Sequence, residues 1–440
     1  MTTLQVWLHG EHVGEVQQLR NGSPRLRFST AAITRWGERS PVLSLALPIS
    51  AKRVEGAAVE AFLDGLLPEG ALRAQLDYQY GSRTPIDLLA HIGQECAGAV
   101  QFTTSDSPPS SGSLRPLSDA ELAELVRDLP TLSPPDGLPI GASLGGVQPK
   151  LLLTQTEDGW AWPVDGAMST HLVKPSPVGT AGPPLLVASE HWAMQVAAAA
   201  GVPTATTSLQ VFDGREAIIV ERFDRRSGRR LHQEDFTQAL SVPSSTKYEP
   251  ELARTNRLRT VHQLAHPNAA NPREFSARLL EAVAFNALVG NGDAHSKNYS
   301  LTIDSSGVVD IAPLYDVAPV MFLGNYFHAG HAVAGQTNLK YITRRHLVDE
   351  AIGWGVRRAR AEAIVDELRD RVIAALEATA VPDELAAVAE KVTRRVTTFP
   401  SGDSAVSSGS SAGQPRQPKG APAGGEWRER DRPESDVDLI

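Results

Sequence analysis

Asp293 and Asn298 are separated by four residues. In protein kinases this spacing belongs to the catalytic loop, where the Asp accepts the proton of the substrate hydroxyl and the Asn holds Mg²⁺. Two short alternating runs at 299–303 and 308–311 predict a β-hairpin, and Asp316 follows it, as expected of a second Mg²⁺ ligand. The spacing therefore predicts a phosphoryl-transfer site with Asp293 as the catalytic residue and with Asn298 and Asp316 as metal ligands.

A helix that ends just before Asp293 and Asn298 is needed to place both residues at one site. Residues 274–289 carry apolar side chains at helical spacing, and Gly290 and Gly292 follow directly. Glycine just past the last periodic residue is typical of a helix end. We therefore expect the helix to stop immediately before the loop.

Residues 141–150 are rich in Gly and other small residues and lead into an apolar strand expected at 151–154. Backbone amides in such a loop can cradle phosphate oxygens. The segment is not a Walker A motif, because no Gly-Lys-Ser/Thr follows at the required spacing. A flexible hairpin loop is the alternative interpretation.

Lys174 ends an expected strand at 170–174, shortly after a strand expected at 160–164. A Gly-rich hairpin followed by a strand that carries Lys is the nucleotide-binding arrangement of a kinase amino-terminal lobe. Glu190 lies on the next expected helix, 185–200, where it can pair with Lys174. Without this context, Lys174 would be an ordinary solvated charge at a strand end.

Residues 233–236 are expected to begin a helical stretch where a kinase hinge would present backbone groups to adenine. Shortly before it, Arg222, Asp224, Arg225 and Arg226 are expected to form a solvated basic rim rather than a catalytic group.

The composition fits a globular protein with more than one domain. The 440 residues are 41% hydrophobic, and the single cysteine, Cys96, excludes an intramolecular disulfide. We expect no membrane segment and a cytoplasmic location, because no apolar run approaches the roughly 18 residues of a membrane span. A net charge of −9 argues against unaided binding to nucleic acid.

The pattern divides the chain into five expected parts. They are an amino-terminal α+β subdomain (1–104), a linker and helix (105–140), a kinase amino-terminal lobe (141–232), a helical carboxy-terminal catalytic lobe (233–399) and a disordered tail (400–440). The first part has no titratable cluster of its own, so we interpret it as a packing or partner surface.

With these residues in place, the sequence resembles the HipA-type toxin kinases, the Ser/Thr kinases of bacterial toxin–antitoxin modules, over roughly residues 3–395. The motifs that carry the resemblance lie at 62–70, 143–150, 170–174, 220–225, 233–235, 247–249, 292–298 and 313–316. The resemblance implies a kinase-like fold distantly similar to phosphoinositide kinases, with Tyr315-Asp316 in place of Asp-Phe-Gly.

The resemblance also implies ATP and Mg²⁺ as cofactors, autophosphorylation at Ser143 and glutamyl-tRNA synthetase as a typical protein substrate. It implies a small DNA-binding, HipB-like antitoxin as partner, so that DNA is contacted only indirectly. Pro149 stands where an acidic residue is common in this loop.

Together these features predict an α+β, protein-kinase-like two-lobed fold and an ATP- and Mg²⁺-dependent serine/threonine protein kinase. The predicted nucleotide-site residues are Ser143, Gly145, Gly146, Val147, Gln148, Lys150, Lys174, Gln233, Glu234, Asp235, His295, Lys297 and Tyr315. His295 is expected to support the loop by hydrogen bonding rather than to bind metal. The alternatives are a small-molecule or lipid kinase of similar fold and a catalytically silent co-repressor that binds an antitoxin; the intact Asp293, Asn298 and Asp316 speak against the co-repressor.

Overall fold

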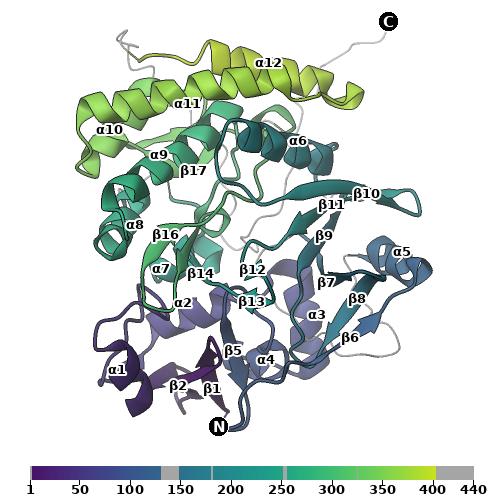
Figure 1. The fold of residues 1–440 in the computed structure, drawn as a ribbon, viewed down its shortest axis with the longest axis vertical. Helices are drawn as coiled ribbons and strands as arrows, with labels where there is room; N and C mark the ends of the chain where they lie inside the picture. The colour runs from purple at the N-terminus through teal and green to yellow at the C-terminus, as the bar shows by residue number, and fades with distance from the viewer. Residues whose placement is uncertain (1, 130–147, 180–181, 251–254, 325, 403–440) are drawn as a thin grey trace, which may run out of the picture.

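The amino-terminal part of the chain forms a five-stranded antiparallel sheet with helices packed on it (Figure 1). The structure, a computed structural model, describes residues 2–129, 148–179, 182–250, 255–324 and 326–402. The strand order is β4-β3-β2-β1-β5. The elements are β1 (Thr3–Leu8), β2 (Glu11–Gln18), β3 (Pro24–Phe28), α1 (Thr30–Trp36), β4 (Val54–Glu55), α2 (Ala57–Gly65), α3 (Gly70–Tyr80), α4 (Pro85–Ile92) and β5 (Val100–Thr103).

A second, six-stranded antiparallel sheet follows, in the order β10-β11-β9-β7-β8-β6. Its elements and the two helices beside it are β6 (Ser113–Pro116), α5 (Asp119–Asp128), β7 (Leu151–Thr156), β8 (Gly159–Val164), β9 (His171–Pro175), α6 (Leu186–Ala199), β10 (Thr207–Phe212) and β11 (Arg215–Glu221). The strands expected at 151–154, 160–164 and 170–174 are confirmed. Strand β6 is mostly exposed and lacks an apolar alternation, so the sequence pattern did not reveal it.

A small three-stranded sheet, β14-β15-β16, lies between the amino-terminal part and the helices. It contains β14 (His232–Asp235), β15 (Ser300–Ile303) and β16 (Val309–Ile311), and it is preceded by the hairpin β12 (Arg225–Arg226) and β13 (Arg229–Arg230). The helical stretch expected from Gln233 onward is wrong, because residues 232–235 pair with β15 and helix α7 (Phe236–Ala239) starts only afterwards. Pairing with a buried neighbour outweighs the poor strand propensity of these polar residues.

The carboxy-terminal part is helical, as expected, and α11 and α12 lie side by side along one end of the molecule (Figure 1). Its helices are α8 (Arg257–Ala265), α9 (Pro272–Val289), α10 (Arg344–Gly353), α11 (Arg358–Ala378) and α12 (Ala386–Thr397), with a hairpin of β17 (His328–Val333) and β18 (Gln336–Asn338). In the described part of the chain, no helix is both long and apolar enough to cross a membrane.

Among the described residues, two large hydrophobic clusters and one small cluster fill the interior, and neither large cluster follows the sequence parts one to one. The first joins α6 and β11 to the carboxy-terminal helices. The second begins in the amino-terminal part, with residues such as Leu89 on α4 and Phe102 on β5, and continues into β7 and β9 through Leu151, Leu153 and Val173. The amino-terminal part and the six-stranded sheet therefore share one core.

Candidate active site

The loop after α9 brings Asp293 and Asn298 together. Helix α9 ends at Gly290, which has a φ of 79°, a left-handed conformation that favours glycine. Asn291 then holds the loop in place through its side chain. Its Nδ2 donates to Asn286 Oδ1 at 2.7 Å, and its Oδ1 accepts from the backbone N–H of Asp293 at 3.0 Å. Asn298 Nδ2 donates to Asp293 O at 2.8 Å. The expected helix end and the joint placement of Asp293 and Asn298 are present.

The Asp293 carboxylate lies in a cleft and accepts a hydrogen bond from the hydroxyl of Tyr248. Burial raises the pKa of Asp293 to about 7; the charge of Asp316 adds to this rise, while the hydrogen bond from Tyr248 opposes it. The side chain keeps 27% of its surface exposed. Asp293 is therefore reachable and has a proton affinity near neutrality, which suits a group that accepts a proton during a reaction.

Lys174, on β9, lies between two carboxylates. Its Nζ is 2.9 Å from Glu190 Oε1 on α6 and 2.7 Å from Asp316 Oδ1. The ion pair expected between Lys174 and Glu190 is thus present. Burial acts to raise the pKa of Asp316, but the attraction of Lys174 outweighs it and lowers that pKa to about 2. Asp316 is an ionised oxygen donor at neutral pH.

Asp316 and Asn298 provide the kind of donors that Mg²⁺ prefers. The amide nitrogen of Asn298 is engaged by Asp293 O, so its amide oxygen is the atom that remains for a cation. Asp316 has a φ of 58°, a sparsely populated conformation of the sort that clusters at functional sites. Among the described residues, no group of three or more His, Cys, Asp or Glu side chains is placed to hold a metal ion.

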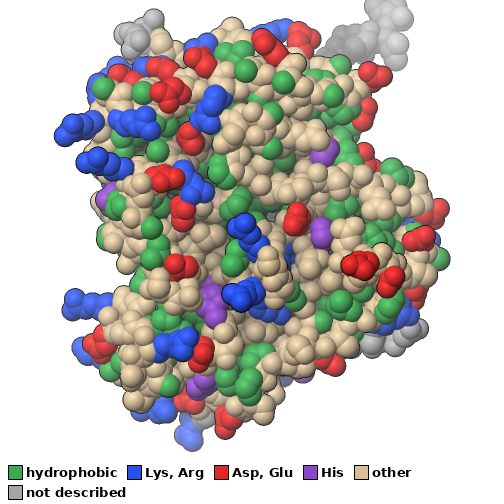
Figure 2. Space-filling model, viewed as in Figure 1, with side chains coloured by type: hydrophobic (Ala, Val, Ile, Leu, Met, Phe, Trp, Pro, Cys, Tyr) green, Lys and Arg blue, Asp and Glu red, His purple; other side chains and the backbone are tan. Residues whose placement is uncertain are grey.

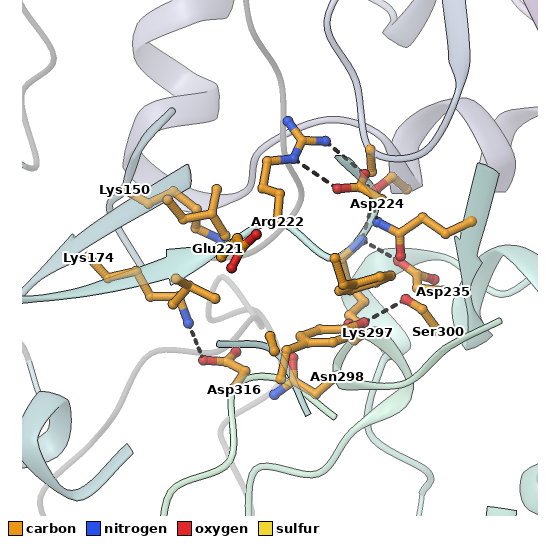
Figure 3. Close-up of a pocket in the computed structure, with 18 of the residues that line it drawn as sticks. Lys150, Lys174, Glu221, Arg222, Asp224, Asp235, Lys297, Asn298, Ser300 and Asp316 are labelled. Carbon is orange, nitrogen blue, oxygen red and sulfur yellow. Dashed lines mark hydrogen bonds and ion pairs between the residues drawn. The ribbon is translucent and has the colours of Figure 1, made fainter. Parts of the chain in front are cut away.

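Three lysines line one cavity with an empty volume of about 840 Å³ (Figure 3). They are Lys150, Lys174 and Lys297, which come from segments far apart in the chain. Burial, followed by repulsion from Lys174, lowers the pKa of Lys150 to about 8. Lys297 Nζ donates to Asp235 Oδ2 at 3.0 Å. Carboxylates line the same cavity, namely Glu221, Asp224, Asp235 and Asp316. The lysine ammonium groups are the donors that this mixed lining offers to an anionic ligand.

Part of the cavity wall is apolar. This part contains Leu172, Ala205, Val220 and Phe223, and Phe223 stacks on Tyr315 with ring centroids 5.6 Å apart. The Tyr315 hydroxyl donates to Lys297 O at 2.9 Å. The cavity therefore combines a flat apolar wall with charged side chains. In Figure 2 the molecular surface is hollowed near its centre, with charged side chains around the hollow.

Residues 221–224 run from the end of β11 to the hairpin β12–β13 and line this cavity, and we call them the crossover segment. The sequence predicted a hinge at residues 233–236. Gln233 and Asp235 do reach the cavity with their side chains, but Glu234 points to the other face of β14, where its Oε1 accepts from Leu45 N at 2.8 Å. The structure therefore does not bring Glu234 to the cavity with Gln233 and Asp235, because successive strand residues face opposite sides.

The expected solvated basic rim is also wrong. Arg222, Asp224 and Arg225 are buried, and only Arg226 is exposed. Arg222 Nη2 donates to Asp224 Oδ2 at 2.8 Å, and Arg225 Nη1 donates to the same oxygen at 2.9 Å. Buried charges of this kind are paired in folded proteins. The sequence does not show which residues pair in space, so these charged residues were expected at the surface.

The His295 side chain packs rather than hydrogen-bonds. Its ring meets Tyr248 edge-on, with centroids 4.8 Å apart, and its Nε2 is 3.8 Å from Asp293 Oδ1. Nδ1 has no hydrogen-bond partner among the described residues. Burial and the neighbouring charge of Lys247 lower the pKa of His295 well below its usual value, so the ring is neutral.

Gln148 and Lys150 line an adjoining cavity together with Lys174, Asp293, Asn298 and Asp316. The other predicted residues of the Gly-rich loop, Ser143, Gly145, Gly146 and Val147, lie outside the described residues.

Sequence reasoning gave no chemical role to Tyr248 or Lys247, which the structure places at the site. Lys247 Nζ is 3.1 Å from Glu69 Oε2 in the amino-terminal part. Glu249, which follows Tyr248 in the chain, is fully buried and accepts from Ala332 N at 3.0 Å. Residues 247–249 were visible only as a motif of the resemblance, since no spacing rule links them to Asp293.

The cleft between a β-sheet with a Lys–Glu pair and a helical part with the Asp293 loop is the architecture of a two-lobed, kinase-like fold. The sequence matches the family model of the HipA N-terminal domain over residues 4–103 and that of the HipA-like C-terminal domain over residues 142–376. The chain belongs to the HipA family of serine/threonine kinase toxins.

Relatives with known names agree with this assignment. A putative kinase, Y4mE, of Sinorhizobium fredii is 36% identical over 71% of this chain and 76% of its own length. The serine/threonine-protein kinase toxin HipA of Shewanella oneidensis is 31% identical over 73% of this chain and 77% of its own length.

A solved structure shares the fold. It is a complex of HipA, HipB and operator DNA from the toxin–antitoxin system of Shewanella oneidensis. The match has a TM-score of 0.74 at 24% sequence identity and covers 89% of this chain and 95% of the other. The kinase-like fold expected from the sequence is confirmed.

Proposed function

We propose that this protein is an ATP- and Mg²⁺-dependent protein kinase that phosphorylates a Ser or Thr hydroxyl and acts as the toxin of a HipA/HipB-type module. The observation that carries the proposal is the convergence of Asp293, Asn298, Asp316 and the Lys174–Glu190 pair on one cleft. A non-catalytic binding protein would not need this set.

The cavity accounts for the two ends of ATP. The flat apolar wall with Phe223 and Tyr315 suits a purine, and the crossover segment lines the same cavity, as a hinge does in kinases. Lys150, Lys174 and Lys297 suit the phosphates. When bound, Mg²⁺ would neutralise phosphate charge, with Asn298 and Asp316 as its protein ligands.

Asp293 orients the acceptor hydroxyl and takes its proton as the hydroxyl oxygen bonds to the γ-phosphorus and the bond to the ADP oxygen breaks. Its raised pKa makes this proton transfer favourable near neutral pH. Lys174, held in place by Glu190, compensates negative charge on the phosphates. Most of the rate comes from positioning and charge stabilisation, since phosphoryl transfer asks for little covalent chemistry from the protein.

The remaining parts of the proposal concern regulation and partners. We assign autophosphorylation to Ser143, a small DNA-binding, HipB-like antitoxin as the partner, and an aminoacyl-tRNA synthetase, such as glutamyl-tRNA synthetase, as the substrate. The antitoxin is supported by the HipB and DNA in the complex of the similar structure. The substrate is supported only by the family resemblance.

The test uses the purified full chain, radiolabelled ATP, Mg²⁺ and a cell lysate. We expect one or a few labelled proteins, identified by mass spectrometry, and a loss of labelling of several orders of magnitude with Asp293→Asn. Label in lipids or small molecules alone would identify a different acceptor. Full labelling by the Asp293→Asn variant would remove Asp293 from the mechanism.

A further inference from the structure

A carboxylate of the amino-terminal part, Glu95, is buried against the crossover segment and the hairpin that follows it. Its Oε1 accepts from Arg222 Nη1 at 2.8 Å and from Arg225 Nη2 at 3.0 Å, and its Oε2 pairs with Arg230. Ser169 donates to Oε1 through both its amide, at 3.1 Å, and its hydroxyl, at 2.8 Å. The Glu95 side chain is 1% exposed.

The backbone next to Glu95 makes further contacts with the same arginines. Cys96 O accepts from Arg222 Nη2 at 3.0 Å and from Arg225 Nη2 at 2.7 Å. Gly98 N donates to Asp224 Oδ2 at 2.7 Å, and Gly98 O accepts from Arg225 Nη1 at 2.8 Å. This turn of the amino-terminal part therefore binds the crossover segment through both side chain and backbone.

Gly98 shows how close this approach is. It has a φ of +73°, and a Cβ atom at this position would lie 2.8 Å from the backbone nitrogen of Gln233. No side chain fits there, so the turn can rest directly on β14 only because residue 98 is glycine.

Glu95 supplies one of the two negative charges of the cluster. Arg222, Arg225 and Arg230 face two carboxylates, those of Glu95 and Asp224. Loss of Glu95 would leave Arg222 and Arg225 with Asp224 as their shared carboxylate and would remove the carboxylate that pairs with Arg230, in a buried setting where an unpaired charge is unfavourable. The arginines would then have to move towards water or towards other acceptors.

Such a movement would reach the nucleotide site directly. Arg222 and Asp224 belong to the crossover segment and line the large cavity, as Figure 3 shows. The guanidinium of Arg222 lies between Asp224 and Glu95, so it transmits the position of Glu95 to the cavity wall.

We propose that Glu95 of the amino-terminal part is a positioning residue for nucleotide binding: it holds the crossover segment in the conformation that receives ATP. This inference rests on the proposed function, since it assigns ATP to the large cavity. Glu95 does not touch the nucleotide. Its effect passes through Arg222, and the amino-terminal part is thereby a component of the ATP site rather than only a packing or partner surface.

The experiment compares Glu95→Gln, which keeps the shape and removes the charge, with Glu95→Asp, which keeps the charge and shortens its reach. Glu55→Gln is the matched control, because Glu55 lies in the same part and pairs with Arg25 at the surface, at 2.6 Å, far from the crossover segment in the fold. For each full-length protein, the affinity for a fluorescent ATP analogue, the KM for ATP, kcat at saturating ATP and the unfolding temperature are measured.

We expect Glu95→Gln to weaken affinity for the ATP analogue and to raise the KM for ATP by about tenfold or more, because displaced binding groups lose their alignment. The value of kcat at saturating ATP should change much less, Glu95→Asp should be intermediate, and Glu55→Gln should match the unmodified protein. A role confined to stability would lower the unfolding temperature and leave the KM unchanged.

Equal nucleotide affinity of folded Glu95→Gln and the unmodified protein would overturn the inference. If Glu95→Gln does not fold, Ser169→Ala decides, because it removes the hydroxyl that bridges Glu95 and Arg222 while it keeps every charge. A several-fold lower affinity in Ser169→Ala supports the inference, and an unchanged affinity overturns it. Absence of nucleotide binding by the unmodified protein would instead refute the proposed function, and this inference with it.

Discussion

Replacement of Asp293 by Asn should make the folded protein more stable at neutral and higher pH while it removes activity. In the cleft the pKa of Asp293 is about 7, compared with an ordinary value of 3.8. Between these two values the folded protein holds a proton that the unfolded chain has released. The contribution of Asp293 to stability therefore decreases as the pH rises from about 4 to about 7. At roughly 1.4 kcal/mol per pH unit, the complete difference is about 4 kcal/mol.

Two features of the site reduce the gain that Asn can recover. The Asp293 side chain is 27% exposed, so water screens part of the unfavourable charge. In the variant, the Tyr248 hydroxyl also donates to a neutral amide oxygen instead of a charged carboxylate, so a hydrogen bond worth roughly 1.5–3 kcal/mol is replaced by one worth about 1 kcal/mol. We therefore expect Asp293→Asn to raise the free energy of unfolding by about 1–2 kcal/mol near pH 8, and to give no gain near pH 4.

The assay is urea-induced unfolding of both proteins at several pH values between 4 and 8, with ATP absent. Asp310→Asn is the control, because Asp310 is a partly exposed carboxylate paired with Arg278 outside the cleft. The difference in free energy between Asp293→Asn and the unmodified protein should increase with pH, and that for Asp310→Asn should not show this rise. A difference for Asp293→Asn that stays constant or declines from pH 4 to pH 7 would refute the reasoning.

Three further changes test other parts of the site. Asp316→Ala should greatly weaken Mg²⁺-dependent ATP binding, because hard cations depend on carboxylate oxygens; nucleotide titrations with and without Mg²⁺ would contradict this if the affinities matched those of the unmodified protein. Tyr248→Phe removes a hydrogen bond that lowers the pKa of Asp293, so the acidic limb of the kcat/KM profile should move to higher pH; a limb that stays in place or moves to lower pH would be evidence against it. Incubation with ATP and Mg²⁺ should phosphorylate Ser143, adding a charge of about −1.5 to −2 near the ATP phosphates and reducing ATP affinity; mass spectrometry that finds unmodified Ser143 in an active preparation would exclude this regulation.

The parts of the site that the sequence predicted are those fixed by local signals. The helix before Asp293 is marked by apolar spacing and by Gly290, and the strand that carries Lys174 is marked by its place after the Gly-rich segment and the strand at 160–164. Both elements form where expected. The pairing of Lys174 with Glu190 follows from kinase geometry once the two elements are placed.

The residues that the sequence misjudged depend on distant partners. Arg222 and Asp224 look like surface charges until Glu95, more than a hundred residues earlier, is known to lie beside them. Glu234 sits in a polar strand that forms only because β15 pairs with it. Tyr248 contacts Asp293 across the fold, and no periodicity in the sequence indicates this contact. Tertiary contacts of this kind override local propensity.

The hydrophobic cluster shared by the amino-terminal sheet and β7–β9 bears on how such chains can be recombined. The match to the HipA N-terminal domain ends at residue 103, and the match to the HipA-like C-terminal domain begins at residue 142. Phe102, which lies before this gap, nevertheless belongs to the same buried cluster as Leu151 and Val173, which lie after it. A fragment cut between them would expose apolar surface that the intact chain buries, at a cost of about 25 cal/mol for each Å². The two halves are therefore not interchangeable modules, and a chimera of two relatives would need compatible packing residues on both sides of the junction.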